Sequence, residues 1–190
     1  MTILTSSQHD ILKEVATIGL GNAITPISKL LNQKVDFCVP NVALTSIETV
    51  QSVIGIPQEK VVAIVVNISK DLNGVMLFVL SSSDAKKISE KISDLQEMVN
   101  IFCGSCLTAL SKLLGYHLDQ SVPASATDMC RAVINQVVAG LGGQSDNLLV
   151  LNTILSLQED NISARLVIIF EPISAQKILT ILDNGPKNND

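Results

Sequence analysis

Asp10 to Pro40 reads DILKEVATIGLGNAITPISKLLNQKVDFCVP, and Ser93 to Pro123 reads SDLQEMVNIFCGSCLTALSKLLGYHLDQSVP. The two stretches align without gaps at a shift of 83 positions, and 12 of the 31 aligned residues are identical. Apolar matches alone would fit any two amphipathic helices, so the weight lies on polar and backbone-determining matches. These are Glu14/Glu97, Gly21/Gly104, Ser28/Ser111 and Pro40/Pro123. The sequence therefore predicts an internal duplication.

The second parts of the two copies match more loosely. Each copy ends in an A-x-K-I element, at 85–88 and at 175–178, and these elements lie 90 positions apart. We expect repeat one at about 8–90, repeat two at about 91–183, and a frayed polar tail at 184–190. Because a solenoid needs at least three short stacked units, two long copies favour one domain over 1–190 with pseudo-twofold symmetry.

The periodicity of apolar residues predicts two long helices, at 8–31 and at 93–114. The polar segment 83–93 is expected to be helical and to run into the second of them. Pro26 lies inside the first helix, where the second copy has Ala109, and it predicts a kink or break near Thr25. Gly115 is expected to end the second helix.

Two β-rich hairpins follow the helices. The runs 61–68 and 75–80 flank Asn73-Gly74, a strong turn signal, and 148–157 and 164–170 repeat the pattern. Further strands are expected at 36–44 and 118–125. The expected fold is α+β: an internal duplication forming an about six-stranded, mainly antiparallel sheet, with two long motif-bearing helices and flanking helices. A helix at 127–141, with a Thr or Asp N-cap, is expected only in the second copy.

Composition excludes several classes of function. Apolar residues make up 47% of the chain and aromatic residues 3%, so the core must be aliphatic. The net charge of −5, without a Lys/Arg cluster, argues against a nucleic-acid partner. The apolar runs are too short to span a membrane, and MTILTSSQHD lacks the features of a signal peptide. We expect a cytoplasmic protein with reduced cysteines and no membrane contact.

Candidate chemical residues lie at the start of the second helix. Ser93, Glu97 and Asn100 are spaced i, i+4 and i+7, which places them on one polar face. A glutamate and an asparagine can hold a water, but the His, Cys or second carboxylate usual in metal sites is missing, so no metal is expected. The same residues also fit a solvated helix flank that begins at a capping serine.

The pattern [Asp/Ser]-x3-Glu-x2-Asn-x22-Pro, present twice, resembles that of the CheC-type phosphatases of the CheC/CheX/FliY family. Ser93, Glu97, Asn100 and Pro123 match it at every spacing. In the first copy Asp10, Glu14 and Pro40 match, but Thr17 stands where the asparagine is expected. The resemblance covers essentially the whole chain.

The resemblance implies hydrolysis of the phospho-aspartate on a CheY-type receiver domain, in chemotaxis or related two-component signalling. Mg²⁺ would be held by the receiver, and this chain would bind no cofactor. By analogy Asn100 orients the attacking water, Glu97 pairs with a receiver lysine, and Ser93 and Pro123 shape the contact. Because the Thr17 hydroxyl is shorter than an amide, the first site is expected to be degenerate, with Glu14 still able to support docking.

Three alternatives remain at this point. The same fold occurs in flagellar switch proteins of the FliY and FliM type, so the chain could be a non-catalytic regulator-binding or switch-type interaction module. In CheC proteins the helix that corresponds to 127–141 binds CheD, so a CheD-type deamidase is an implied partner, although the helix could also simply pack on the sheet. Cys103-x-x-Cys106 could be a redox or half-metal motif, but its place inside a helix favours a core role.

Overall fold

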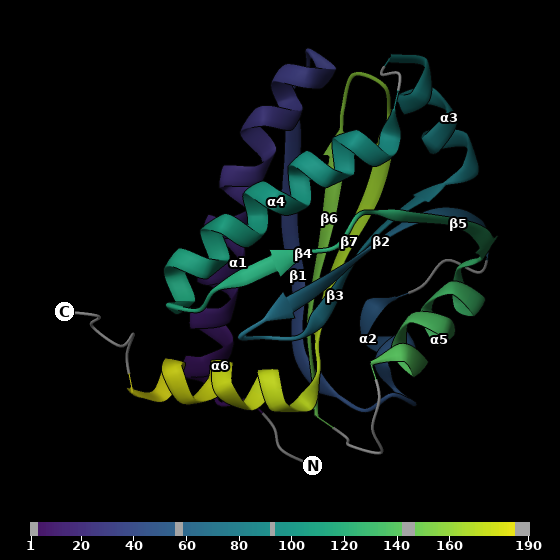
Figure 1. The fold of residues 1–190 in the computed structure, drawn as a ribbon. Coiled ribbons are helices and arrows are strands. Elements are labelled where there is room, and N and C mark those ends of the chain that lie inside the picture. The colour runs from purple at the N-terminus through teal and green to yellow at the C-terminus, as the bar shows by residue number, and fades with distance from the viewer. Residues whose placement is uncertain (1–3, 56–58, 92–93, 142–146, 185–190) are drawn as a thin grey trace.

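The computed structural model describes residues 4–55, 59–91, 94–141 and 147–184. Within these residues the elements repeat in one order, helix, strand, helix, hairpin and helix (Figure 1). The first half contains α1 (Ser6–Leu31), β1 (Val35–Thr45), α2 (Val50–Ile54), β2 (Lys60–Lys70), β3 (Gly74–Ser81) and α3 (Ser82–Lys91). The second contains α4 (Leu95–Leu114), β4 (Leu118–Gln120), β5 (Ala124–Met129), α5 (Cys130–Gly140), β6 (Leu148–Leu157), β7 (Ile162–Phe170) and α6 (Pro172–Asn184).

The strands form one antiparallel sheet in the order β1-β6-β7-β3-β2-β4, with β5 also paired to β2. This confirms the predicted α+β class. The sheet has seven strands because the strand predicted at 118–125 is interrupted at 121–123 and continues as β5. In the first half the corresponding strand, β1, is continuous. Its pairing with β6 shifts register between Cys38 and Asn41, at the place where the second half has the interruption.

In each half, the hairpin pairs along one side with a strand from the other half. β1 pairs with β6, whereas β4 and β5 pair with β2, and the two hairpins meet where β3 pairs with β7. The two copies therefore share one hydrogen-bonded sheet, and each copy covers an edge strand of the other.

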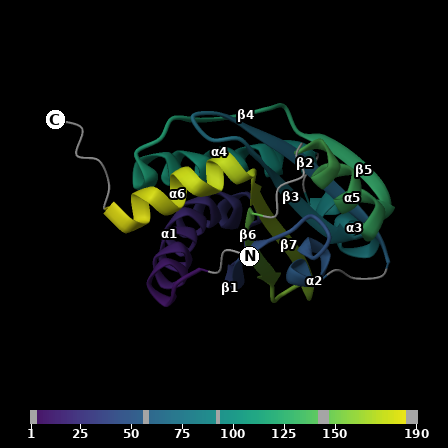
Figure 2. The same ribbon diagram turned by 90° about the horizontal axis from the view of Figure 1, so that it is seen from below.

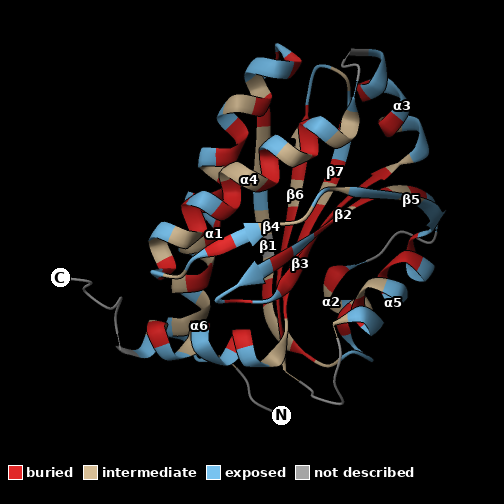
Figure 3. Cartoon of the chain, in the orientation of Figure 1, coloured by how far each residue is buried: buried red, intermediate tan, exposed pale blue. Residues whose placement is uncertain are grey.

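Helices cover both faces of the sheet (Figures 1 and 2). On one face α1, α3, α4 and α6 bury Met76, Phe78 and Phe102 among other residues; on the opposite face α2 and α5 pack on Val75, Leu77 and Val79. Successive residues of β3 alternate between the two faces, so every residue of the strand before Ser81 is buried (Figure 3). This explains why the central strands are continuous apolar runs and do not alternate with polar residues.

α1 runs unbroken through Pro26, so of the predicted kink or break near Thr25 the break is wrong. Proline removes one backbone hydrogen bond, but Ala23, Ile24 and Ile27 around it are buried in the core. The packing of this apolar face holds the helix together across the proline. A capping box between Thr5 and Gln8 starts the helix two residues before the predicted position.

The joining segment is not one helix that continues into α4. α3 ends at Lys91, and a new helix begins at Leu95 because Asp94 caps it: the Asp94 Oδ1 accepts hydrogen bonds from the backbone N–H groups of Gln96 and Glu97. The second motif helix therefore starts two residues later than predicted.

The extra helix of the second half is also different from the prediction. α5 begins at Cys130, and the expected cap residues Thr127 and Asp128 lie in β5; the N-cap is Met129, which makes no side-chain capping bond. α2 takes the corresponding place in the first half, so both halves have a helix here. The asymmetry is one of length, 11 residues in α5 against five in α2.

The predicted hairpin at Asn73-Gly74 is present, but its glycine is needed for a different reason. Gly74 is the first residue of β3, and the residue with positive φ in this turn is Lys70. A Cβ at position 74 would lie 2.4 Å from the Ile169 carbonyl oxygen of β7. Close strand approach, and not a left-handed turn, therefore requires glycine here.

Among the described residues one helix, α4, is long and apolar enough to span a membrane by length and composition. Half of its most apolar window is buried inside the protein. Its apolar face packs on α1 and the sheet, as expected of a core helix.

Candidate functional site

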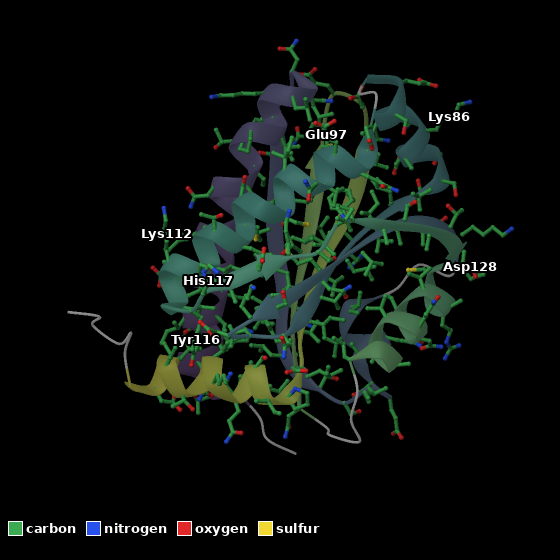
Figure 4. The ribbon with its side chains drawn as sticks, viewed as in Figure 1. Lys86, Glu97, Lys112, Tyr116, His117 and Asp128 are labelled. Carbon is green, nitrogen blue, oxygen red and sulfur yellow. The ribbon has the colours of Figure 1, made fainter. Side chains whose placement is uncertain are left out.

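Glu97 lies in the first turn of α4, where its position is fixed by the helix start. Its backbone N–H donates to the Asp94 Oδ1 at 3.2 Å, and its side chain is exposed. Figure 4 shows Glu97 near the N-terminal end of α4 and Lys112 near the other end. A carboxylate in the first turn is favoured by the helix dipole and remains free to pair with a partner's cation.

Asn100 follows one turn later and is half-buried against β4. The Gln120 side chain reaches it from the last residue of β4: Nε2 donates to the Asn100 side-chain Oδ1 at 2.6 Å and to the Asn100 backbone carbonyl at 3.2 Å. Among the described residues, the Asn100 Nδ2 donates to no protein acceptor. The amide is thus held by its oxygen, with its N–H groups left for another molecule.

Gln120 is placed by three contacts of β4. The Gln120 backbone pairs with Ile68 of β2, and the Leu118 N–H donates to the Ser111 Oγ of α4. The Gln120 carboxamide lies over Gly104. A Cβ at Gly104 would be 3.5 Å from both Nε2 and Oε1, which is ordinary van der Waals contact. The carboxamide therefore rests directly on the helix.

Two exposed aliphatic residues are close to Asn100 or Gln120 in the sequence, and a groove is lined in part by Asn100. Ile101 is 40% exposed and Val122, just before Pro123, is 86% exposed. A groove of about 530 Å³ between α4 and α1 is lined by Asn22, Asn100, Ile101, Gly104, Ser105, Thr108, Ala109 and Lys112. A contiguous exposed apolar patch rimmed by polar residues is typical of a surface that contacts another protein, and Ile101 and Val122 are candidates for such a patch.

The structure therefore brings together two of the four predicted residues of the second motif, Glu97 and Asn100, on one exposed side of α4. Pro123 is half-buried in the segment between β4 and β5, the same segment that carries Val122. Ser93 lies outside the described residues. Sequence reasoning did not assign Gln120, Ile101 or Val122 to the site. Ile101 and Val122 carried a signal, because both are identical in the two copies, whereas Gln120 only lies within the fixed spacing between Asn100 and Pro123.

The first motif is arranged differently. Asp10 and Glu14 are exposed on α1, which begins six residues earlier than α4 does in the aligned numbering, and Pro40 lies in β1. The Thr17 hydroxyl donates to the Lys13 carbonyl of its own helix at 2.7 Å. Phe37 occupies the position that aligns with Gln120, and it packs against the core. The first face thus has neither the amide nor its hydrogen-bond donor.

The cysteines take no part in this site. Cys103 and Cys106 are buried on the core side of α4. Burial raises the pKa of the Cys103 thiol well above its usual range and that of Cys106 to about 12. Because thiolate is the reactive form, a redox or metal-binding use of this pair is disfavoured. No group of three His, Cys, Asp or Glu side chains that could hold a metal occurs among the described residues.

No protein-family model matches the chain. Among curated proteins, it is 31% identical over 164 residues to the CheY-P phosphatase CheC of Bacillus subtilis, covering 77% of this chain and 78% of CheC. It is 29% identical over 137 residues to the flagellar motor switch phosphatase FliY of the same organism. This alignment covers 63% of this chain but 35% of FliY. The chain thus corresponds to about a third of the length of that FliY.

Solved structures show the same fold. FliY of Thermotoga maritima has a TM-score of 0.76 and 19% identity, with 96% of this chain and 99% of that chain covered. The CheX–CheY–BeF3–Mg²⁺ complex of Borrelia burgdorferi has a TM-score of 0.51 and 15% identity, with 82% and 97% covered. Since the identity to CheC extends over more than three quarters of both chains and the motif spacing is kept, the chain belongs to the CheC/CheX/FliY family.

Proposed function

We propose that this chain is a phosphatase that hydrolyses the phospho-aspartate of a CheY-type response regulator, with one competent site on α4. The observation that carries the proposal is the Asn100 amide: Gln120 holds its oxygen, its N–H groups donate to no acceptor in the described part of the chain, and the exposed Glu97 lies one turn away. The similarity to CheC, a CheY-P phosphatase, supports the same substrate class. The proposal includes a cytoplasmic location and no cofactor in this chain.

In the proposed reaction a water oxygen forms a bond to phosphorus while the bond between phosphorus and the aspartyl oxygen breaks. The products are inorganic phosphate, which takes up the water's proton, and a free aspartate. Phosphoryl transfer of this kind depends mainly on positioning and on charge stabilisation. Asn100 would position the water by donating from Nδ2 to its oxygen. Mg²⁺ would be supplied by the receiver; a solved CheX complex contains CheY, BeF3 and Mg²⁺ together.

Glu97 would contribute to docking by pairing with a lysine of the receiver. It is exposed, and the exposed Ile101 and Val122 are candidates for the apolar part of the contact. The first face keeps part of this surface, since Glu14 and Ile18 are also exposed there. That face would bind a receiver weakly and hydrolyse its phosphoryl group poorly or not at all.

A CheD-type partner on α5 is a further part of the proposal. α5 packs on the sheet face opposite α4 through Cys130, Val133, Ile134 and Val138, and it exposes Ala132 and Gln136. Asn135 is less suited to a partner, because its Oδ1 accepts a hydrogen bond from Gln51 of α2. A partner bound at α5 would leave Asn100 accessible. If this assignment holds, Gln136→Arg weakens binding of a CheD-type protein without changing the melting temperature; equal binding contradicts it.

The test of the main proposal measures loss of phosphate from a purified CheY-type receiver that has been labelled with acetyl phosphate. We expect the chain to accelerate the loss above the receiver's own rate, in catalytic amounts. The alternative, a non-catalytic switch-type module, predicts that the chain binds the BeF3-loaded receiver while the rate of phosphate loss is unchanged. Binding without acceleration would overturn the enzymatic assignment.

A further inference from the structure

We infer that Gln120 is a positioning residue that sets which end of the Asn100 amide faces the phosphorylated partner. This inference rests on the proposed function, because it concerns the same site. The contact joins the end of β4 to the first part of α4, and neither the motif spacing nor the family assignment includes Gln120.

The orientation follows from the backbone carbonyl of Asn100. A carbonyl oxygen can only accept, so the Gln120 atom 3.2 Å from it must be the Nε2 amide nitrogen and not Oε1. The same Nε2 lies 2.6 Å from the Asn100 side chain, so the atom of Asn100 that faces it must also be an acceptor, Oδ1. The fixed backbone carbonyl therefore determines the orientation of the Gln120 amide, and the Gln120 amide determines that of Asn100. As a result, the Asn100 Nδ2 points away from Gln120.

Within the part of the chain that the structure describes, the oxygen of the Gln120 amide is left unpaired in a buried position, and this energetic cost supports a specific role for the residue. The Gln120 Oε1 is buried and, among the described residues, has no hydrogen-bond partner. A flipped Gln120 would bring two oxygens together at Asn100, so the observed orientation is kept although it leaves Oε1 unpaired. Packing alone would be satisfied by an apolar side chain, and this is what the first half has, since Phe37 stands at the aligned position and packs against the core.

The functional consequence is that Asn100 acts on the partner as a hydrogen-bond donor. With Oδ1 engaged, Asn100 meets the attacking water or a phosphoryl oxygen with its N–H groups. The hydrogen bond to Oδ1 also restricts rotation of the amide, so less ordering is required when the receiver docks. Gln120 touches neither substrate nor water in this arrangement, and its effect is exerted through Asn100.

Two variants of the full chain test the inference. Gln120→Met keeps the length of the side chain but cannot donate; we expect kcat for a phosphorylated receiver to fall about tenfold, the scale of one hydrogen bond, with KM unchanged. In Gln120→Glu a carboxylate can only accept, so it should draw the Asn100 Nδ2 inward and lower kcat at least as much. Phe37→Met, the matched change in the first half, should leave kcat unchanged.

An NMR measurement on the unliganded chain separates this inference from the proposed function. Side-chain ¹⁵N–¹H signals report whether the Gln120 amide protons exchange slowly and whether the Asn100 signals shift in Gln120→Glu but not in Phe37→Met. If the wild-type chain hydrolyses no receiver phosphate yet these signals behave as expected, the proposed function fails and the orientation stands.

The outcomes that overturn the inference are equally distinct. If Gln120→Met keeps wild-type kcat, or raises KM and lowers the melting temperature with kcat unchanged, Gln120 only attaches β4 to α4. If Gln120→Glu fails to fold, Gln120→Met and the wild-type amide exchange decide the question. Rapid exchange of the Gln120 amide protons in the wild-type chain also contradicts the inference.

Discussion

The α4 face and the α1 face come from the same duplicated sequence, yet they differ in more than one residue. On α4 an asparagine amide is held by a glutamine from the neighbouring strand. On α1 the aligned pair is Thr17 and Phe37: the threonine hydroxyl donates to its own helix, and the phenylalanine packs into the core. Because Glu14 and Ile18 remain exposed, the α1 face keeps residues of the kind proposed for docking but lacks the amide contact proposed to position water.

The largest effect is expected when the amide of the competent face is removed. Asn100→Ala should reduce the rate of receiver dephosphorylation on the order of 100-fold, as for loss of one positioned donor at a reacting centre. The matched change Thr17→Ala should leave the rate unchanged. The measurement is phosphate loss from a labelled receiver at saturating receiver concentration. Near wild-type turnover of Asn100→Ala would show that the α4 face is not the site.

A second prediction concerns transfer of the missing contact to the α1 face. In an Asn100→Ala background, Thr17→Asn together with Phe37→Gln should recover about tenfold more activity than Thr17→Asn alone, because one hydrogen bond then orients the new amide. Phe37 is partly buried in the core, so the melting temperature of each variant must be measured as a control. If the two variants are equally active, the first face does not lack activity for want of a glutamine at position 37.

A smaller effect is expected from reversing the charge at the docking position. Glu97→Lys should weaken binding of a BeF3-loaded receiver about tenfold, since it places like charge against the expected lysine. Glu14→Lys should change the measured affinity less, because the α1 face contributes only weak binding. Titration by fluorescence or calorimetry at two salt concentrations gives both values. The docking role is wrong if the Glu97 variant binds as tightly as the wild type.

The smallest functional effect is expected at the cysteines, which also divide between the halves. Cys38 in β1 is exposed, whereas Cys103, Cys106 and Cys130 are buried with raised pKa values. At pH 8 a thiol reagent should modify Cys38 alone, and Cys38→Ser should not alter phosphatase activity. Fast labelling of a second thiol in the folded chain would contradict the packing of α4 or, for Cys130, that of α5.

The buried thiols also give stability a definite pH dependence. Their folded-state pKa lies above the ordinary value of 9.0, so the folded state retains protons that the unfolded state releases. Their contribution is complete below pH 9.0 and is lost as the pH rises toward about 12, the pKa of Cys106 in the folded chain. The melting temperature of the wild type should therefore fall over this interval more than that of Cys106→Ala.

Much of the architecture could be predicted because its signals are local. The two motif helices, the two hairpins and the α+β class follow from apolar periodicity and turn residues, and the structure confirms them. The errors arose where a local signal competes with packing. Pro26 does not break α1 because the surrounding face is buried, and Thr127 and Asp128 do not cap α5 because they pair with β2.

The sequence by itself determined the duplication and the position of Glu97, because identical residues at fixed spacing require no knowledge of the fold. The family and the position of Asn100 followed from the spacing of the motif in the second copy, which also requires no knowledge of the fold. Only the tertiary structure decided that the halves exchange strands and that Gln120 meets Asn100. Both depend on which distant strands pair and in which register. That choice is made by the sheet as a whole, since side chains separated by 20 positions in the chain meet only after β4 has paired with β2.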